Sequence, residues 1–305
     1  MMEELFYREK DLFLQKLHPT AAMVFICVLM VLSLIFTNPL YLAGLFLCTG
    51  FLIRELQGLK SWEFFLKAGL LMTIPVMIIN PLVSKAGATV LLRGPRLPAF
   101  GEIDISMEAI FYGAVMSLRL LDVMSVFCLY NIMLHPDKTL NMLERFAFKS
   151  TLVLSLATRM FPAMLRRLEN IREIQAVRGV DFEKGTFKEV LDKYMNLIYI
   201  LLLSSLEDSM EIAEAMQARA FGSGRRTCYI RIPFKPRDFI CTAAGIAALF
   251  AGIFGAVKGY GTMVFYPYLG HLISREDILL LLFLHMMLLI PVFMSWGWRR
   301  CRYFR

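Results

Sequence analysis

Two arginines stand in similar surroundings, each beside small residues and shortly before a glycine. Arg178 follows an alanine and a valine and precedes Gly179, while Arg219 stands between two alanines, with Gly222 close behind. A guanidinium is always charged and makes forked hydrogen bonds to carboxylates. Small neighbours let the backbone beside it approach a partner closely. We therefore expect these arginines to dock into acidic pockets on partner proteins.

A purely structural explanation is available for the same residues. The C-terminal end of a helix is the negative end of its dipole, so arginine is favourable there. Gly179 and Gly222 can supply the left-handed conformation that caps a helix. For either arginine alone, capping is the simpler interpretation. The occurrence of two similar phrases after two long helices favours docking for the pair.

Two amphipathic helices must position these arginines. Along residues 159–177, apolar residues recur at steps of three and four, which predicts a helix ending near Arg178. A second helix is expected to start near Phe187 and to end at about 221, and a shorter helix over 137–148 precedes both. The helix periodicity rests on Phe161, Met164, Leu165, Leu168, Ile171 and Ile174 in the first helix, and on Tyr199, Leu202, Leu203, Leu206, Met210, Ala213 and Met216 in the second. Since both long helices end in an arginine phrase, they form a weak internal repeat.

The remainder of the chain is typical of an integral membrane protein. Of its 305 residues, 58% are hydrophobic and only 19% charged, and the charge is concentrated in the middle. We predict an all-α membrane protein with about six transmembrane helices plus the long amphipathic helices. The apolar stretches are 21–36, 40–53, 64–82, 107–134, 239–257 and 278–296. The first two are short for a span of about 20 residues.

The distribution of lysine and arginine predicts the orientation. The basic residues of the N-terminus, the central region and the C-terminal tail fit the cytoplasmic side, which leaves both termini cytoplasmic. The expected regions are 1–134 with four spans, a cytoplasmic 135–237, and 238–305 with two spans. The net charge of +8 fits this arrangement better than it fits nucleic-acid binding.

The sequence offers little for catalysis, for a cofactor or for a metal. The six cysteines and four histidines show no ligand spacing, and no phosphate-binding loop or serine-nucleophile motif occurs, so we expect no ATPase activity in this chain. The acidic residues Glu207, Asp208, Glu211 and Glu214 are expected to form a solvated face or to pair with local arginines. Arg119 and Asp122, inside an apolar stretch, are expected to neutralise each other and face the bundle interior, the alternative being a substrate or proton site.

Four stretches together resemble one known family. They are "ATRMFPAMLRRLENIR", "NIREIQAVRGVDFEKG", "EAMQARAFGSGRRTCY" and "HPDKTL", the last in the place of a short coupling segment. The chain resembles the transmembrane T component of energy-coupling factor (ECF) transporters, which are ABC importers of vitamins and metal ions in prokaryotes. The resemblance covers most of the chain and is strongest over 135–229.

The resemblance implies a scaffold in the prokaryotic plasma membrane. Two Ala-Arg-Gly-like triplets at the ends of cytoplasmic coupling helices would dock into two ABC ATPase subunits, which hydrolyse the ATP, and the scaffold would hold a small membrane-embedded substrate-binding S component. Carried over, the first arginine triplet is Val177, Arg178 and Gly179, and the second is Ala218, Arg219 and Ala220. Each triplet departs from the pattern at one position, Val177 or Ala220, where the residue is bulkier.

Two other functions remain open from the sequence. A conventional ABC permease carries one docking loop with a Glu-Ala-Ala pattern, which Glu214, Ala215 and Gly222 match faintly. A second arginine phrase argues against it. A membrane-embedded enzyme would use the acidic run that ends at Glu214 to bind metal, but that run lacks the repeated aspartate motif of such enzymes.

Overall fold

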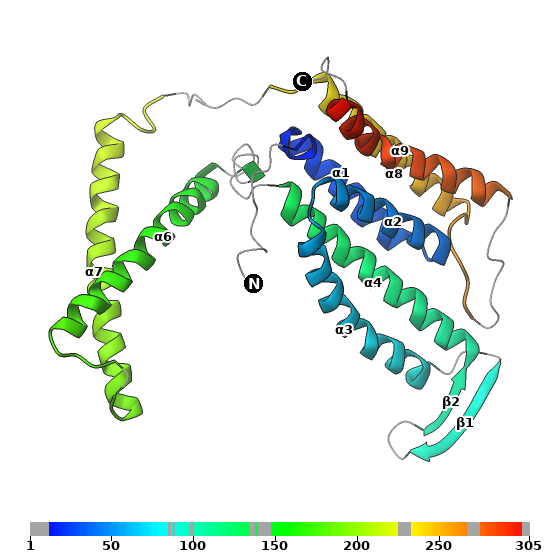
Figure 1. Ribbon diagram of the computed structural model, residues 1–305, viewed down its shortest axis with the longest axis horizontal. Coiled ribbons are helices and arrows are strands. Elements are labelled where there is room, and N and C mark those ends of the chain that lie inside the picture. The colour runs from blue at the N-terminus through cyan, green and yellow to red at the C-terminus, as the bar shows by residue number, and fades with distance from the viewer. Residues whose placement is uncertain are drawn as a thin grey trace. The chain divides into compact units, whose positions relative to one another are not determined.

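The computed structural model describes residues 12–84, 87, 89–97, 101–134, 138–139, 148–182, 184–224, 233–266 and 275–300. The chain divides into two compact units. Met1–Thr139 and Ile232–Arg305 form the first, which we call the membrane unit, and Leu140–Arg231 form the second, which we call the two-helix unit (Figure 1).

The membrane unit contains a helix at each of the six predicted apolar stretches. They are α1 (Pro19–Ile35), α2 (Pro39–Glu55), α3 (Leu59–Val83), α4 (Met107–Met133), α8 (Pro236–Val257) and α9 (Arg275–Arg300). Helices α3, α4, α8 and α9 are long and apolar enough to cross a bilayer, whereas α1 and α2 have 17 residues each. The predicted all-α membrane fold is confirmed, with one short hairpin as its exception.

Local sequence explains how the tight turn between α1 and α2 forms. Asn38 is the N-cap of α2, and its side chain accepts the backbone N–H of Leu40 at 3.0 Å. Pro39 follows at the first helical position, where its missing N–H costs nothing. The predicted turn is therefore confirmed, and it places two antiparallel helices in succession.

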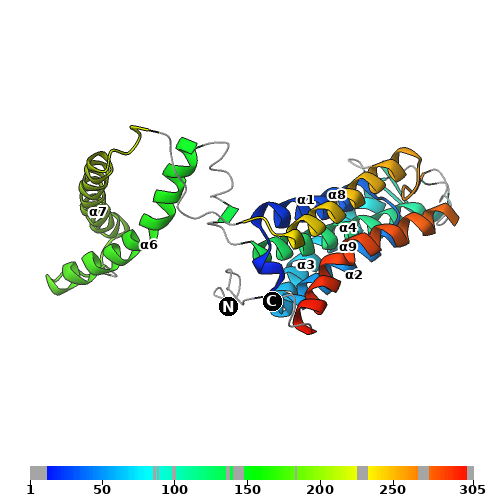
Figure 2. The same ribbon diagram turned by 90° about the horizontal axis from the view of Figure 1, so that it is seen from above.

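The six helices pack into one bundle (Figure 2). Helix α4 contacts α1, α2 and α3, while α8 lies between α1 and α9. Gly252 of α8 faces α1 so closely that a Cβ there would come within 2.3 Å of Leu32 Cδ2. Small residues at such contacts let membrane helices approach each other closely. Helix α3 turns many apolar side chains outward, Leu71 at 65% exposure among them, as a lipid-facing surface requires.

An unpredicted β-hairpin joins α3 to α4. Strands β1 (Val90–Leu97) and β2 (Gly101–Ser106) pair antiparallel. The hairpin is tied to α4 through Glu108, whose carboxylate accepts the backbone N–H of Thr89 at 3.2 Å and its hydroxyl at 2.6 Å. The Gly-Pro pair inside β1 and the irregular register explain why no strand alternation was visible in the sequence.

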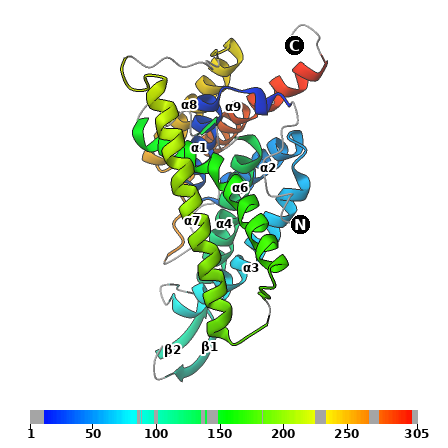
Figure 3. The ribbon, with the colours of Figure 1, turned by 90° about the vertical axis from the view of Figure 1, so that its left-hand side faces the viewer.

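In the described part of the two-helix unit, α6 (Phe148–Val177) and α7 (Phe187–Ala218) cross each other at an angle (Figure 3). The predicted start of the second long helix at Phe187 is confirmed. Thr186 and Glu189 form a reciprocal capping box there, which fixes where α7 begins. The shorter helix predicted over 137–148 lies outside the described residues except at 138, 139 and 148.

Candidate docking site at two helix ends

The first arginine triplet forms the C-terminal cap of α6. Val177 is the last residue of the helix and Gly179 takes the left-handed conformation, with φ +88°. The backbone N–H of Gly179 donates to the carbonyl of Ala176, and that of Val180 donates to the carbonyl of Gln175, both at 3.0 Å. These two bonds define a Schellman motif, in which Arg178 is the C-cap residue.

The second triplet ends α7 in the same way. Arg219 is the C-cap, and Ala220 takes the left-handed conformation with φ +55°. The N–H of Ala220 donates to Gln217 at 2.9 Å and that of Phe221 to Met216 at 3.0 Å, which repeats both Schellman bonds. The left-handed cap is therefore Ala220. The prediction that Gly222 fills this role is wrong, although Gly222 has φ +91° two residues further on.

Both arginines consequently occupy the same position of the same motif. At each end the motif satisfies two of the terminal helical carbonyls with backbone N–H groups, and it uses the side chain of neither Arg178 nor Arg219. Both residues are exposed, and neither guanidinium pairs with a carboxylate that the structure describes. Val177, beside Arg178, is 90% exposed. Capping and docking are thus compatible, because each uses different atoms.

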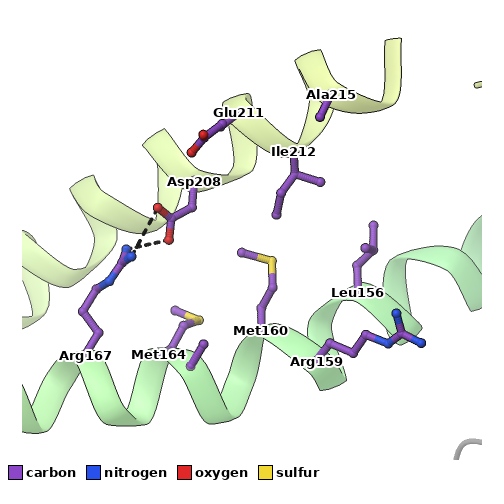
Figure 4. Close-up of a pocket in the computed structure, with 10 residues that line it drawn as sticks. Leu156, Arg159, Met160, Met164, Arg167, Asp208, Glu211, Ile212 and Ala215 are labelled. Carbon is purple, nitrogen blue, oxygen red and sulfur yellow. Dashed lines mark hydrogen bonds and ion pairs between the residues drawn. The ribbon is translucent and has the colours of Figure 1, made fainter. Parts of the chain in front are cut away.

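An ion pair joins the two helices. Arg167 of α6 makes a forked contact with Asp208 of α7, with N–O distances of 2.5 and 3.3 Å, and also donates to the Ser204 hydroxyl at 3.1 Å. The expected pairing of the acidic run with a local arginine is confirmed for Asp208. Beside this contact lies an open groove of about 590 Å³ between the helices, into which Met160, Met164 and Ile212 project (Figure 4).

Both the acidic residues and the apolar face of α7 are largely exposed within the two-helix unit. Glu207, Glu211 and Glu214 lie exposed, as a solvated face predicts, and no group of three metal-ligating side chains gathers among the described residues. Apolar side chains also face outward. Tyr199, Leu206 and Met210 are 67%, 64% and 66% exposed. An apolar surface of this kind is typical of a protein contact.

Two residues that were not singled out from the sequence hold the turn between α6 and α7: Phe182 lies in the turn and Lys193 lies on α7. Phe182 is only 7% exposed, and Lys193 donates from its ammonium to the carbonyls of Asp181 and Lys184. An apolar residue between charged neighbours, as Phe182 is, was the available signal. Nothing in the sequence indicates the Lys193 contacts, because their acceptors are backbone atoms.

Arg119 and Asp122 do not form the expected ion pair. Arg119 donates from Nη2 to the carbonyl of Phe36 at 2.8 Å, and Phe36 is the C-cap of α1. The terminal carbonyls of a helix lack intrahelical partners, so a long side chain on a neighbouring helix can reach them. Asp122 is fully buried in the bundle interior, as expected, and neither of its oxygens has a hydrogen-bond partner in the described part of the chain.

Comparison with known proteins finds relatives over most of the chain. The family model described as CbiQ, cobalt transport protein, matches residues 11–230. A curated relative from Macrococcus caseolyticus, the energy-coupling factor transporter transmembrane protein EcfT, is 25% identical over 240 residues, which cover 74% of this chain and 87% of the relative. The protein of the same name from Staphylococcus aureus is 23% identical over 243 residues, covering 75% and 87%. That from Thermotoga maritima is 32% identical over 101 residues, covering 32% and 37%.

Proposed function

Because this chain belongs to the CbiQ cobalt transport protein family, we propose that it is the scaffold, or T component, of an ECF-type ABC importer. In this role it couples ATP binding and hydrolysis in two partner ATPase subunits to reorientation of a small membrane-embedded S component, which binds a vitamin or a metal ion. The ATPase activity resides in the partners, and this chain supplies neither catalytic residues nor a cofactor.

One observation supports the proposal above the others. Both long helices of the two-helix unit end in the same Schellman cap, and each cap presents an exposed arginine at the same position. Two equivalent presentations suit two equivalent receptors, which a pair of ATPase subunits provides. Forked guanidinium–carboxylate bonds give such a contact both charge and geometric specificity. A permease that needs a single docking loop would not require the second end.

The proposed coupling is mechanical. ATP binding brings the two ATPases together and hydrolysis lets them separate, so helix ends anchored to different ATPases move relative to each other. Helices α6 and α7 contact each other through Arg167 and Asp208, and this contact serves as the pivot. The exposed apolar face of α7 around Met210 then transmits the movement to the S component. Methionine suits a contact that changes, since it repacks easily.

The proposal puts the chain in the prokaryotic plasma membrane with both termini cytoplasmic. The distribution of lysine and arginine supports this orientation, because cytoplasmic loops are enriched in these residues. The two-helix unit is then cytoplasmic, where the ATPases are.

Purification tests the proposal. The tagged full-length chain would be isolated from its native membrane in mild detergent, and the co-purifying proteins identified and counted. We expect two ATPase subunits and one small membrane protein per chain. A chain that purifies alone and still binds a small molecule would contradict the proposal and indicate a self-contained transporter.

A further inference from the structure

Lys193 closes the α6–α7 turn by binding two backbone carbonyls at once. Its ammonium donates to the carbonyl of Asp181 at 2.7 Å and to that of Lys184 at 2.8 Å. Hydrogen bonds from a charged donor are shorter and stronger than those between neutral groups. The two acceptors lie three residues apart and follow Gly179 by two and five residues. A single side chain from α7 therefore fixes the path of this loop.

Phe182 lies between the two clamped carbonyls and packs against both helices. Its ring is 5.4 Å from the ring of Tyr194 on α7, and the guanidinium of Arg172 on α6 is 5.9 Å from its centre. Leu197, three residues after Tyr194 on α7, is only 2% exposed. The loop is thus held by an aromatic anchor as well as by the ammonium.

These contacts begin immediately where the Schellman motif ends. The N–H of Val180 is committed to Gln175, and the carbonyl of the next residue, Asp181, is committed to Lys193. The chain is therefore fixed on both sides of Gly179. A binding group that is already ordered loses less conformational entropy when it docks, which increases affinity without a new contact.

We propose that Lys193 is a positioning residue for Arg178, which holds the first triplet in the conformation that enters the ATPase. This inference rests on the proposed function. Lys193 acts through Arg178 and does not itself touch the ATPase, because its ammonium is already engaged by the turn.

The test replaces Lys193 by methionine, which keeps a flexible apolar stem of similar size and removes every donor. Lys188→Met is the matched control, since Lys188 is an exposed lysine in the first turn of the same helix. The full-length variants would be purified with their co-expressed ATPase subunits. Retention would then be measured as the fraction of ATPase that stays bound when the complex is diluted. We expect Lys193→Met to weaken retention about tenfold and Lys188→Met to leave it unchanged. Lys193→Arg, which keeps a charged donor, should restore most of the retention.

A double-mutant cycle with Arg178→Ala separates positioning from general destabilisation. If Lys193 acts through Arg178, Lys193→Met causes no further loss of retention in the Arg178→Ala background. Amide exchange of Val180 should accelerate in Lys193→Met, while that of Phe221 on the other helix end should not change. An equal loss in both backgrounds, or unchanged Val180 exchange, would overturn the inference.

The same cycle distinguishes failure of this inference from failure of the proposed function. If Arg178→Ala weakens retention and Lys193→Met does not, docking stands and the positioning role is overturned. If Arg178→Ala itself leaves retention unchanged, docking through this triplet is wrong, and the positioning role is overturned with it.

Discussion

The ends of α6 and α7 share one backbone motif but differ in how they are supported. At the α6 end the left-handed position is Gly179, and at the α7 end it is Ala220. The aromatic residue that follows each triplet differs as well, since Phe182 is 7% exposed whereas Phe221 is 45% exposed. Beyond α7, Ser223 turns back and donates its N–H and its hydroxyl to the carbonyl of Ala220.

The presentation of the arginine is therefore maintained by two separate means. The α6 end combines an unstrained glycine with a loop anchored to the neighbouring helix. The α7 end tolerates a Cβ in the left-handed region, which costs about 1 kcal/mol, and closes on itself locally. Retention of the same geometry despite this cost fits a requirement for the position of Arg219 itself.

Removal of the aromatic anchor, Phe182, should produce the largest difference in stability between the two helix ends. Phe182→Ala deletes a buried ring and is expected to reduce the stability of the α6–α7 turn by about 3 kcal/mol. The matched control is Phe221→Ala, which should cost far less because that ring is half exposed. Native-state hydrogen exchange of the turn amides measures both. Equal losses would show that the two ends are supported alike.

Substitution of the residue at the left-handed position should change the stability of the cap in opposite directions at the two helix ends. Gly179→Ala introduces a Cβ at φ +88° and should destabilise the α6 cap by about 1 kcal/mol, although no atom lies within 4 Å of that Cβ. Ala220→Gly relieves the same strain and should stabilise the α7 cap by about 0.5–1 kcal/mol. Amide exchange of Val180 and Phe221 reports the two caps. A shift of the same sign at both ends would contradict the strain argument.

The smallest expected effect comes from the contact that both helices share. Arg167 and Asp208 are 41% and 38% exposed, so their ion pair is screened by solvent. Asp208→Asn should therefore destabilise the unit by only about 0.5 kcal/mol, and equally at both helix ends. Glu207→Gln is the control for loss of charge. A loss at one end only would show that the ion pair supports that end specifically.

The sequence was sufficient for the parts of the fold that rest on periodicity and composition. The six apolar stretches all form helices, and the second amphipathic helix begins at Phe187, as its pattern predicts. The first amphipathic helix was predicted over 159–177 and ends there as expected, but α6 begins at Phe148, eleven residues earlier. The arginine positions at the helix ends follow from the same pattern. Glycine was a sound guide at Gly179 and a misleading one at Gly222, since Ala220 adopts the less favourable conformation instead.

The remaining features depend on contacts that residue type and spacing do not reveal. The bond from Arg119 to the carbonyl of Phe36 joins residues 83 positions apart, and its acceptor is a backbone atom that no residue type reveals. The nearby carboxyl of Asp122 was the more obvious partner by spacing. The Lys193 clamp was hidden for the same reason. The β-hairpin was hidden because its register is irregular and β1 contains a Gly-Pro pair.

Charge reversal at the two helix ends tests the central claim most directly. Arg178→Glu and Arg219→Glu would be introduced singly and together, and the ATPase subunits retained by each purified full-length chain counted, with Arg166→Glu on the exposed face of α6 as the control. We predict that each single variant retains one ATPase in place of two, that the double variant retains none and does not transport, and that the control is unchanged. Retention of both ATPases and of transport by the double variant would contradict the account.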